Sequence, residues 1–234
     1  MCYSTTLDRE VRALERDMNR RMLEDSRKVY LHPDEEADGD RSILFKNRTT
    51  AFARPFWPVV FNDHPNMIEP ARWGFLPGYV NDEEKAKEYL KKFTTFNAIS
   101  EEVDTKATYQ KAWNAGQRCL IPVTSFTEWQ HCPIEGKKAV NKIPHRIRAK
   151  GGEVFSLGGI WTDTALGYRT YAILTTKANS LMEVIHNSKK RQPVIIPKDM
   201  ERFWLSKEIS PDYIKTLCDP LPADEMDAEL EEAA

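Results

Sequence analysis

The sequence lacks the features that would place the protein in a membrane or in an oxidising compartment. No apolar run approaches the roughly 18 consecutive residues needed to span a bilayer. The N-terminal segment 1–21 carries charges where a secretory signal peptide needs its apolar stretch. The four cysteines are scattered and form neither a disulfide framework nor a repeated Cys-x-x-Cys metal pattern. We therefore expect a reduced, soluble protein of the cytoplasm that makes no contact with a membrane.

The chain also lacks a strong excess of either charge, since 34 Lys and Arg residues face 36 Asp and Glu residues, for a net charge of −2. Residues 223–234 hold six acidic residues and no basic one, so residues 1–222 alone carry +4. We expect 223–234 to be a disordered acidic tail and 1–222 to form one domain, because no internal repeat or long linker interrupts it. Basic clusters at 85–92, 137–150 and 189–191 permit contact with nucleic acid, although a solvated charged face explains each of them as well.

Short apolar runs and helical periods alternate irregularly along the chain. The spacing of Leu7, Val11 and Leu14 predicts an amphipathic helix over 5–27, and an acidic segment with proline and glycine predicts a loop over 32–40. Runs rich in Val, Ile, Phe and Trp predict strands at 56–61, 73–77, 119–126, 154–161, 171–175 and 194–197. Helical periods return at 81–93, 105–114, 180–186 and 198–205. Without a regular β-α-β alternation, the expected fold class is α+β, a single domain with a curved, barrel-like, mostly antiparallel sheet surrounded by helices.

Cys2 directly follows the initiator methionine, so removal of Met1 would leave an N-terminal 1,2-aminothiol. With reference pKa values of about 8 for the α-amine and about 8.5 for the thiol, both nucleophiles are available near neutral pH. An amine attacks an aldehyde to form a Schiff base, and a neighbouring thiolate can then close a five-membered thiazolidine ring. Taken alone, Cys2 is more simply explained as an incidental early residue.

Five further motifs place polar or reactive residues beside apolar runs. They are Arg72-Trp73-Gly74-Phe75-Leu76-Pro77, Asn97-Ala98-Ile99-Ser100-Glu101, Arg118-Cys119-Leu120-Ile121-Pro122 with Phe126-Thr127-Glu128-Trp129, Thr175-Thr176-Lys177-Ala178-Asn179, and His186 followed by Pro193-Val194-Ile195. Each motif is weak alone, but their order and a cysteine at position 2 are specific. Over roughly residues 1–205, this ordered set resembles the SRAP family, the abasic-site processing proteins also called SOS response-associated peptidases.

The resemblance implies a covalent trap for abasic sites in single-stranded DNA. The ring-opened abasic sugar presents an aldehyde, and the family's functional residues correspond here to Cys2, Asn97, Glu128 and His186. Glu128 would relay protons to and from the α-amine, and aromatic neighbours would raise its pKa toward that work. His186 would promote opening of the sugar or hold its hydroxyl, and Asn97 would orient the amine or the thiol. Without the resemblance, a strand-end carboxylate explains Glu128 equally well, a capping or core histidine is the better explanation of His186, and Asn97 is explained as a turn residue.

The resemblance further implies that the protein tracks phosphates with Arg and Lys and stacks bases on aromatic rings, without reading sequence. We expect a monomer that needs no cofactor and no metal. The candidate DNA-binding residues are Arg72, Trp73, Tyr79, Arg118, Trp129, Thr175 and Arg191, with Pro55 as a wedge against a base.

The chain departs from the family pattern at several positions that bear on DNA binding. Ile99 stands where the family usually has Arg, which removes an expected phosphate contact, and Gln192 replaces a frequent Met. Tyr79 stands where Trp is common, and an insertion rich in Lys, Glu and Asp follows it over 81–92. Lysines of this insertion, or the cluster 189–191, are candidates to restore the lost charge.

Two other functions remain open at this point. Cys2, His186 and Glu128 also suit the nucleophile, base and orienting residue of an N-terminal-nucleophile hydrolase or thiol peptidase. Alternatively, the chain is a non-covalent single-strand-binding module in which Cys2 is idle. A zinc site from His131, Cys132 and His145 is a weak third idea, because their spacing matches no common ligand pattern.

Overall fold

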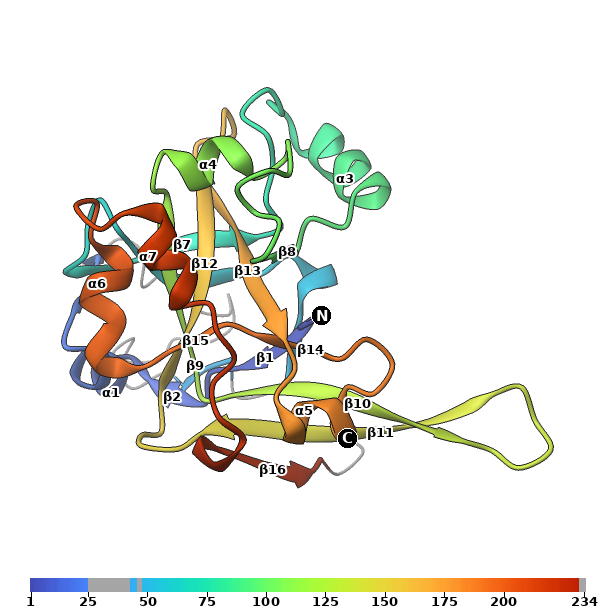
Figure 1. The fold of residues 1–234 in the computed structure, drawn as a ribbon. Coiled ribbons are helices and arrows are strands. Elements are labelled where there is room, and N and C mark those ends of the chain that lie inside the picture. Colours follow the sequence, from blue (N-terminus) through green and yellow to red (C-terminus); the bar gives the residue numbers. More distant parts are fainter. Residues whose placement is uncertain (25–42, 46–47, 232–234) are drawn as a thin grey trace.

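A ring of five strands forms the centre of the molecule in a computed structural model, which describes residues 1–24, 43–45 and 48–231 (Figure 1). The ring strands are β6 (Phe56–Phe61), β7 (Met67–Trp73), β9 (Arg118–Val123), β12 (Phe155–Asp163) and β13 (Arg169–Lys177). Antiparallel pairing runs in the order β13-β12-β9-β6-β7, and a parallel pairing of β13 with β7 closes the ring. Closure leaves none of these five strands as a sheet edge.

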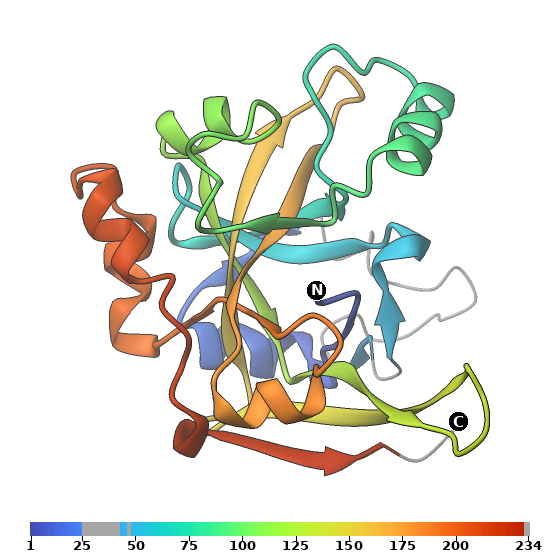
Figure 2. The same cartoon turned by 45° about the vertical axis from the view of Figure 1, so that its right-hand side comes forward.

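A second sheet packs beside the ring and carries the N-terminal strand. Its strands are β1 (Ser4–Thr6), β5 (Thr49–Thr50), β10 (Ser125–Pro133), β11 (Val140–Ala149) and β16 (Met226–Leu230), in the order β16-β11-β10-β1-β5. Only Thr124 separates β9 from β10, so one nearly continuous stretch of chain links the two sheets. The β10–β11 hairpin projects away from the body of the molecule (Figures 1 and 2).

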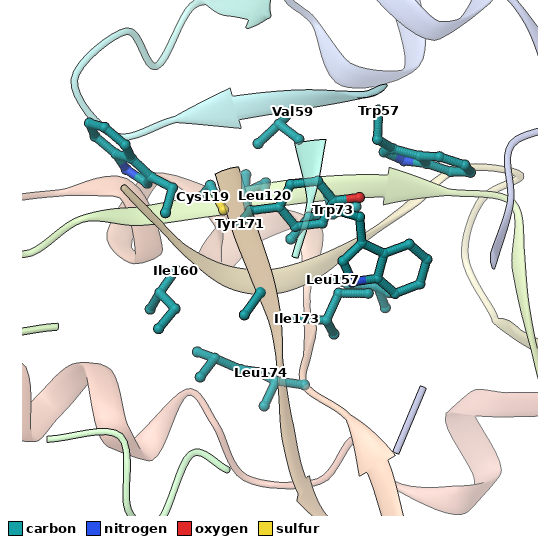
Figure 3. Close-up of a cluster of buried hydrophobic side chains, with 14 of the residues drawn as sticks. Trp57, Val59, Trp73, Cys119, Leu120, Leu157, Ile160, Tyr171, Ile173 and Leu174 are labelled. Atoms are coloured by element: carbon teal, nitrogen blue, oxygen red, sulfur yellow. The ribbon is translucent and has the colours of Figure 1, made fainter. Parts of the chain in front are cut away.

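The core fills the ring and the space between the two sheets. All six residues of β9 are buried, because this strand lies between β6 and β12 and is covered on both faces. Figure 3 shows the rings of Trp57, Trp73 and Tyr171 packed with aliphatic side chains. At Gly159, an added Cβ would lie 2.8 Å from the Ala172 carbonyl oxygen of β13, so the close approach of β12 to β13 requires glycine there.

Short helices cover the ring and connect its strands. The α-helices are α1 (Val11–Met18), α3 (Glu83–Lys92), α4 (Gln110–Asn114), α5 (Ser180–Ile185), α6 (Glu201–Leu205) and α7 (Pro211–Thr216). The 3₁₀ helices are η2 (Ala51–Ala53), η3 (Lys198–Met200) and η4 (Ala223–Glu225). The remaining strands are β2 (Arg9–Glu10), β3 (Arg21–Met22), β4 (Ile43–Leu44), β8 (Asn97–Ile99), β14 (Arg191–Pro193) and β15 (Ile195–Ile196). Asp82 and Asn179 cap α3 and α5 by accepting the backbone N–H groups of Lys85 and Met182.

The expected α+β class with a barrel-like, mostly antiparallel sheet is confirmed. The helix predicted over 5–27 is wrong in extent, since β1 precedes α1 and β3 follows it. Asn19 ends α1 in the left-handed conformation, with φ of 51°. The loop predicted over 32–40 lies outside the described residues. Among the described residues, no helix is long and apolar enough to cross a membrane.

The prediction of a disordered acidic tail over 223–234, separate from a domain ending at 222, is wrong as far as residue 231. Residues 223–225 form η4, and β16 pairs with β11 in the second sheet. Met226 anchors the strand, being only 3% exposed. The acidic side chains meet basic partners on β11 and directly after it, with Arg148–Glu229 at 3.2 Å and Lys150–Asp227 at 3.4 Å. Charge compensation across the strand pair explains why an acidic segment folds here.

Candidate functional site

Four separate elements bring their side chains to the N-terminus of the chain. Cys2 lies two residues before β1, and Glu128 lies on β10, the neighbour of β1. Asn97 begins β8, which pairs in parallel with β13, and His186 is the C-cap of α5. In Figures 1 and 2, the N-terminus lies on the same side of the molecule as α3 and the β10–β11 hairpin. The structure thus brings together the four residues predicted to be catalytic.

Hydrogen bonds and close approaches define the geometry of this group. Asn97 Nδ2 donates to the Cys2 carbonyl oxygen at 2.8 Å and so fixes the main chain of residue 2. The terminal amine of Met1 lies 3.8 Å from Glu128 Oε1. Glu128 Oε2 lies 3.7 Å from His186 Nε2. Asn97 Oδ1 and Glu128 Oε1 are buried and have no hydrogen-bond partner among the described residues, so the site holds spare acceptors beside the N-terminal chain.

Glu128 is 3% exposed, which sets its protonation state. Burial raises the pKa of Glu128 to about 8, although the charge of the terminal amine, 3.8 Å away, acts in the opposite direction. At neutral pH the carboxyl is therefore mostly protonated. A protonated carboxylic acid at this position can donate a proton and later take one back.

His186 is held as a neutral acceptor. Its Nδ1–H donates to the Arg191 carbonyl oxygen at 2.7 Å, which leaves Nε2 free to accept. The Met1 amine lies 3.3 Å from Nδ1 and 3.2 Å from Nε2, and with this tautomer it donates to Nε2. Burial, and then the charge of the amine, lower the pKa of His186 to about 4. The imidazole is thus uncharged across the physiological range.

Cys2 is enclosed while Met1 is present. It has no exposed surface, and its thiol donates to the Ser4 carbonyl oxygen, with Sγ and O 3.7 Å apart. Burial, and then the nearby Glu128, raise the pKa of the Cys2 thiol far above its ordinary value. Burial also lowers the pKa of the Met1 amine. The thiol is therefore protonated at neutral pH in this form, while the amine is shifted toward its nucleophilic neutral state.

Three of the predicted DNA-binding side chains lie in the core, where they have almost no exposed surface, and this burial counts against their predicted contact with DNA. Trp73 and Thr175 have no exposed surface, and Trp73 Nε1 donates to the Phe96 carbonyl oxygen. Arg118 is 2% exposed, and its guanidinium donates to the carbonyl oxygens of Trp204 and Ser206. Backbone carbonyl groups thus satisfy the buried guanidinium of Arg118. The Arg-Cys-x-x-Pro motif alone does not distinguish this structural role from phosphate binding.

The other five predicted DNA-binding residues lie at or near the surface. Tyr79 is 74% exposed, whereas Pro55, Arg72, Trp129 and Arg191 are half-buried. Arg72 contacts Glu83 of α3, and Arg191 makes two hydrogen bonds to Glu101, at 2.8 and 2.7 Å. The guanidinium of Arg48 lies 5.4 Å from the centre of the Trp129 ring.

Sequence reasoning missed an aromatic pair beside the N-terminus. The rings of Tyr3 and Phe52 stack with centroids 5.3 Å apart, and Phe52 is 65% exposed. Tyr3 directly follows Cys2, and Ala51 N donates to the Tyr3 carbonyl oxygen at 2.8 Å. The only signal for this pair was an aromatic residue adjacent to Cys2, because Phe52 stands in no recognisable motif.

The proposed zinc ligands do not come together. No group of three or more His, Cys, Asp or Glu side chains in the described part of the chain is arranged to hold a metal ion. His131 and Cys132 are neighbours on β10, and His145 pairs instead with Glu128 across the β10–β11 ladder.

Comparison with known proteins identifies the family. The sequence profile described as "SOS response associated peptidase (SRAP)" matches residues 1–230. The chain is 35% identical to the abasic site processing protein YoqW of Bacillus subtilis over 176 residues, which cover 73% of this chain and 72% of YoqW. It is 34% identical to YoaM, another abasic site processing protein of the same organism, covering 73% of this chain and 71% of YoaM. A crystal structure from Bacteroides thetaiotaomicron, 28% identical, superposes with a TM-score of 0.81 over 99% of this chain and 92% of that one. The chain therefore belongs to the SRAP family.

Proposed function

We propose that this protein captures abasic sites in single-stranded DNA by forming a thiazolidine between Cys2 and the sugar aldehyde. One observation carries the proposal. Asn97 holds the main chain of residue 2 beside a buried acid, Glu128, and a neutral base, His186. The relatives named abasic site processing proteins support the choice of substrate. All four residues come from one chain, so the proposed reaction uses no side chain from a second copy.

The proposed reaction begins with removal of Met1, which frees the α-amine of Cys2. The amine nitrogen attacks the aldehyde carbon, a C–N bond forms, and the nitrogen proton passes to the oxygen to give a carbinolamine. Glu128 donates its proton to the leaving hydroxyl, so that water departs and a protonated imine remains. Glu128, now a carboxylate, accepts the Cys2 thiol proton as sulfur attacks the imine carbon. The C–S bond closes the ring, the nitrogen takes up the electron pair as a neutral amine, and one water molecule is released overall.

The protonation states of the site match these roles. A carboxyl with a pKa of about 8 is both a proton donor at neutral pH and a base once it has lost its proton. His186, neutral with Nε2 open, can hold the sugar hydroxyl without adding charge to a buried site. Asn97 Oδ1 has no partner among the described residues, and we assign it the role of accepting an N–H of the freed amine.

A thiol peptidase has less support from the geometry. A cysteine peptidase needs its thiol in contact with a histidine that takes the proton. Here the Cys2 thiol donates to the Ser4 carbonyl oxygen, and no contact between Sγ and His186 is found among the described residues. Turnover of foreign peptides, lost in Cys2→Ala, would favour the peptidase instead.

The experiment is denaturing electrophoresis of the protein with an abasic single-stranded oligonucleotide, followed by peptide mass mapping. We expect a heat-stable adduct at Cys2 in the wild type, none in Cys2→Ala, and a more labile one in Cys2→Ser, because an alkoxide is far less available than a thiolate. A residue left in front of Cys2 should abolish the adduct while leaving the fold intact. Cys132→Ala, which removes a half-buried thiol of β10, is the matched control and should crosslink normally. A heat-stable adduct in Cys2→Ala, or one mapped to a lysine, would exclude the mechanism.

A further inference from the structure

Three polar side chains from separate elements converge on one carboxylate near the first turn of α3. Glu83 Oε1 accepts hydrogen bonds from Arg72 Nη1 at 2.7 Å and from the Tyr168 hydroxyl at 2.6 Å. Glu83 Oε2 accepts from Arg54 Nη1 at 3.5 Å. Arg54, Arg72 and Tyr168 are called the arginine cluster below. An anion in contact with all three is the feature that needs explanation.

Arg72 and Tyr168 of the arginine cluster are also held by aromatic contacts that do not involve α3. The Arg72 guanidinium lies 4.7 Å from the centre of the Phe56 ring and 5.2 Å from that of the Tyr168 ring. These two rings pack edge to face with centroids 5.4 Å apart. Arg54 follows η2 in the left-handed conformation, with φ of 49°. The aromatic contacts thus hold Arg72 and Tyr168, and η2 fixes the main-chain position of Arg54, whereas the acceptor comes from a surface helix.

The carboxylate leaves part of the cluster unsatisfied. Arg54 Nε and Nη2 and Arg72 Nε are buried and have no hydrogen-bond partner in the described part of the chain. Unpaired buried guanidinium N–H groups are costly, because they have lost water without gaining an acceptor. Both anions pair with arginine forks, but a carboxylate offers only two oxygens in one plane, whereas a tetrahedral phosphate offers further oxygens outside that plane. The surplus of donors therefore fits a phosphate better than the carboxylate.

Glu83 is also the partner that can leave. Its side chain is 44% exposed, whereas the side chains of Arg54 and Arg72 are 11% and 27% exposed. Burial would raise the pKa of Glu83, but the Tyr168 hydrogen bond and the charges of Arg72 and Arg54 outweigh it and lower that pKa. The carboxylate of Glu83 is therefore an anion at neutral pH. Because its side chain is already partly exposed, it can rotate into solvent without opening the core.

A short stretch of chain connects the arginine cluster to the proposed reaction site. Ala51 is hydrogen-bonded to Tyr3, the residue after Cys2, and Arg54 follows three residues later across η2. At about 2 Å per residue in a 3₁₀ helix, that separation is roughly 6 Å along the chain. The exposed ring of Phe52, stacked on Tyr3, lies on this same short helix. Moving from the N-terminus along η2, the stacked rings of Tyr3 and Phe52 come first and the arginine cluster comes next.

We propose that the arginine cluster binds a backbone phosphate of the DNA strand that carries the lesion, and that Glu83 occupies this phosphate site in the free protein. The inference rests on the proposed function for its choice of a DNA strand as ligand. Binding exchanges one anion for another at the cluster and displaces the first turn of α3. Glu83 is then an internal competitor that weakens binding of undamaged DNA, and α3 regulates access to the strand path.

The first test measures binding of a short undamaged single-stranded oligonucleotide by fluorescence anisotropy at low salt. Glu83→Gln removes the competing charge and should tighten binding by about three- to tenfold, since it eliminates an anion held by charge-assisted hydrogen bonds. Glu84→Gln, an exposed neighbour on the same helix, makes the same change in net charge and should alter affinity by less than about twofold. If Glu83→Gln binds no more tightly than Glu84→Gln, Glu83 is only an anchor for α3 and the inference is wrong.

The second test removes the phosphate donor. Arg54→Ala should weaken binding and reduce the slope of log affinity against log salt by about 0.7, the value of one phosphate contact on a single strand. Arg202→Ala, an exposed arginine of α6 on the other side of the barrel (Figure 1), should leave the slope unchanged. Arg54→Gln serves if the alanine variant does not fold. An unchanged slope in a folded Arg54 variant would overturn the phosphate site.

The two proposals fail in distinguishable ways. These binding measurements use undamaged DNA and do not involve Cys2. If the Glu83→Gln and Glu84→Gln variants bind undamaged DNA with the same affinity while the wild type crosslinks normally, only the phosphate site is contradicted. Absence of any crosslink, together with the predicted affinity changes, would contradict only the thiazolidine chemistry.

Discussion

Glu128 and His186 lie 3.7 Å apart in one buried site, and burial moves their pKa values in opposite directions. The pKa of Glu128 rises to about 8 and that of His186 falls to about 4. At neutral pH both are therefore mostly uncharged, and the amine is the principal charge that the site must accommodate. A low-charge site suits imine chemistry, in which a neutral amine attacks and a proton donor removes the hydroxyl.

The pKa of Glu128 gives the crosslinking reaction a pH dependence with a definite sign. Glu128 is mostly protonated below about pH 8 and mostly ionised above it. The rate at which the borohydride-trapped adduct forms should therefore fall as pH rises past about 8. Glu128→Gln should be slower by about 10²–10⁴-fold and should lack this decline. Glu135→Gln, on the exposed tip of the hairpin, is the control and should keep the wild-type profile. A rate that continues to rise above pH 8 in the wild type would exclude Glu128 as the acid.

The same shift predicts a change in stability. Because the folded-state pKa of Glu128 is raised, its contribution to stability is complete below the unfolded value of about 4.5 and is lost as pH rises through about 8. The melting temperature of Glu128→Gln relative to wild type should therefore increase between pH 5 and pH 9. If the melting temperatures of the two proteins change with pH in the same way over that range, burial does not hold the carboxyl of Glu128 protonated.

At the scale of elements, strands made of a continuous apolar run were predictable from the sequence, whereas polar strands stabilised by charge pairing were not. The run at 56–61 coincides with β6, whereas the run at 119–126 divides at Thr124 into β9 and the start of β10. The β10–β11 hairpin and β16 are polar or exposed over much of their length, so apolar periodicity could not reveal them. Pairing across the strands, which a single sequence does not display, decides their structure.

The candidate site was predictable only through its motifs. Residues 2, 97, 128 and 186 meet through contacts between distant parts of the chain, and no local pattern specifies such contacts. The motifs could not separate surface from core either, and Trp73, Arg118 and Thr175 proved to be buried. The clustering of Arg54 and Tyr168 around Glu83 belongs to no motif, because it joins a loop, a strand end and a helix.

The docking of β16 can be tested through its anchor. Met226 is 3% exposed at the start of the strand, so Met226→Ala should lower the free energy of unfolding by about 2 kcal/mol. Leu230→Ala, at a position that is 68% exposed on the same strand, should change it by less than about 0.5 kcal/mol. Urea unfolding followed by tryptophan fluorescence measures both. Equal effects of the two substitutions would mean that β16 does not pack on β11 in solution.

At the scale of the whole molecule, folding of the acidic strand changes the electrostatic interpretation of DNA binding. The +4 assigned to residues 1–222 is not a free basic surface, because Asp227 and Glu229 of β16 pair with Lys150 and Arg148. The folded chain carries a formal charge of −2, which gives little long-range attraction for a duplex. Affinity must then come from a few local phosphate contacts and from stacking on exposed rings, such as those of Phe52 and Tyr79.

Stacking requires unpaired bases, so the protein should prefer single strands. At equal salt, we expect crosslinking to an abasic site in a single strand to be at least about tenfold faster than to the same lesion inside a duplex, where unpairing and unstacking the neighbours costs a few kcal/mol. Rates are compared by quenching reactions on labelled oligonucleotides with and without a complementary strand. Phe52→Ala should slow crosslinking to the single strand and reduce the difference in rate between single-stranded and duplex DNA. Phe203 is exposed on α6, away from the N-terminus, and Phe203→Ala should change neither quantity. Equal rates on the two substrates would show that charge or direct lesion contact, and not stacking, selects the DNA.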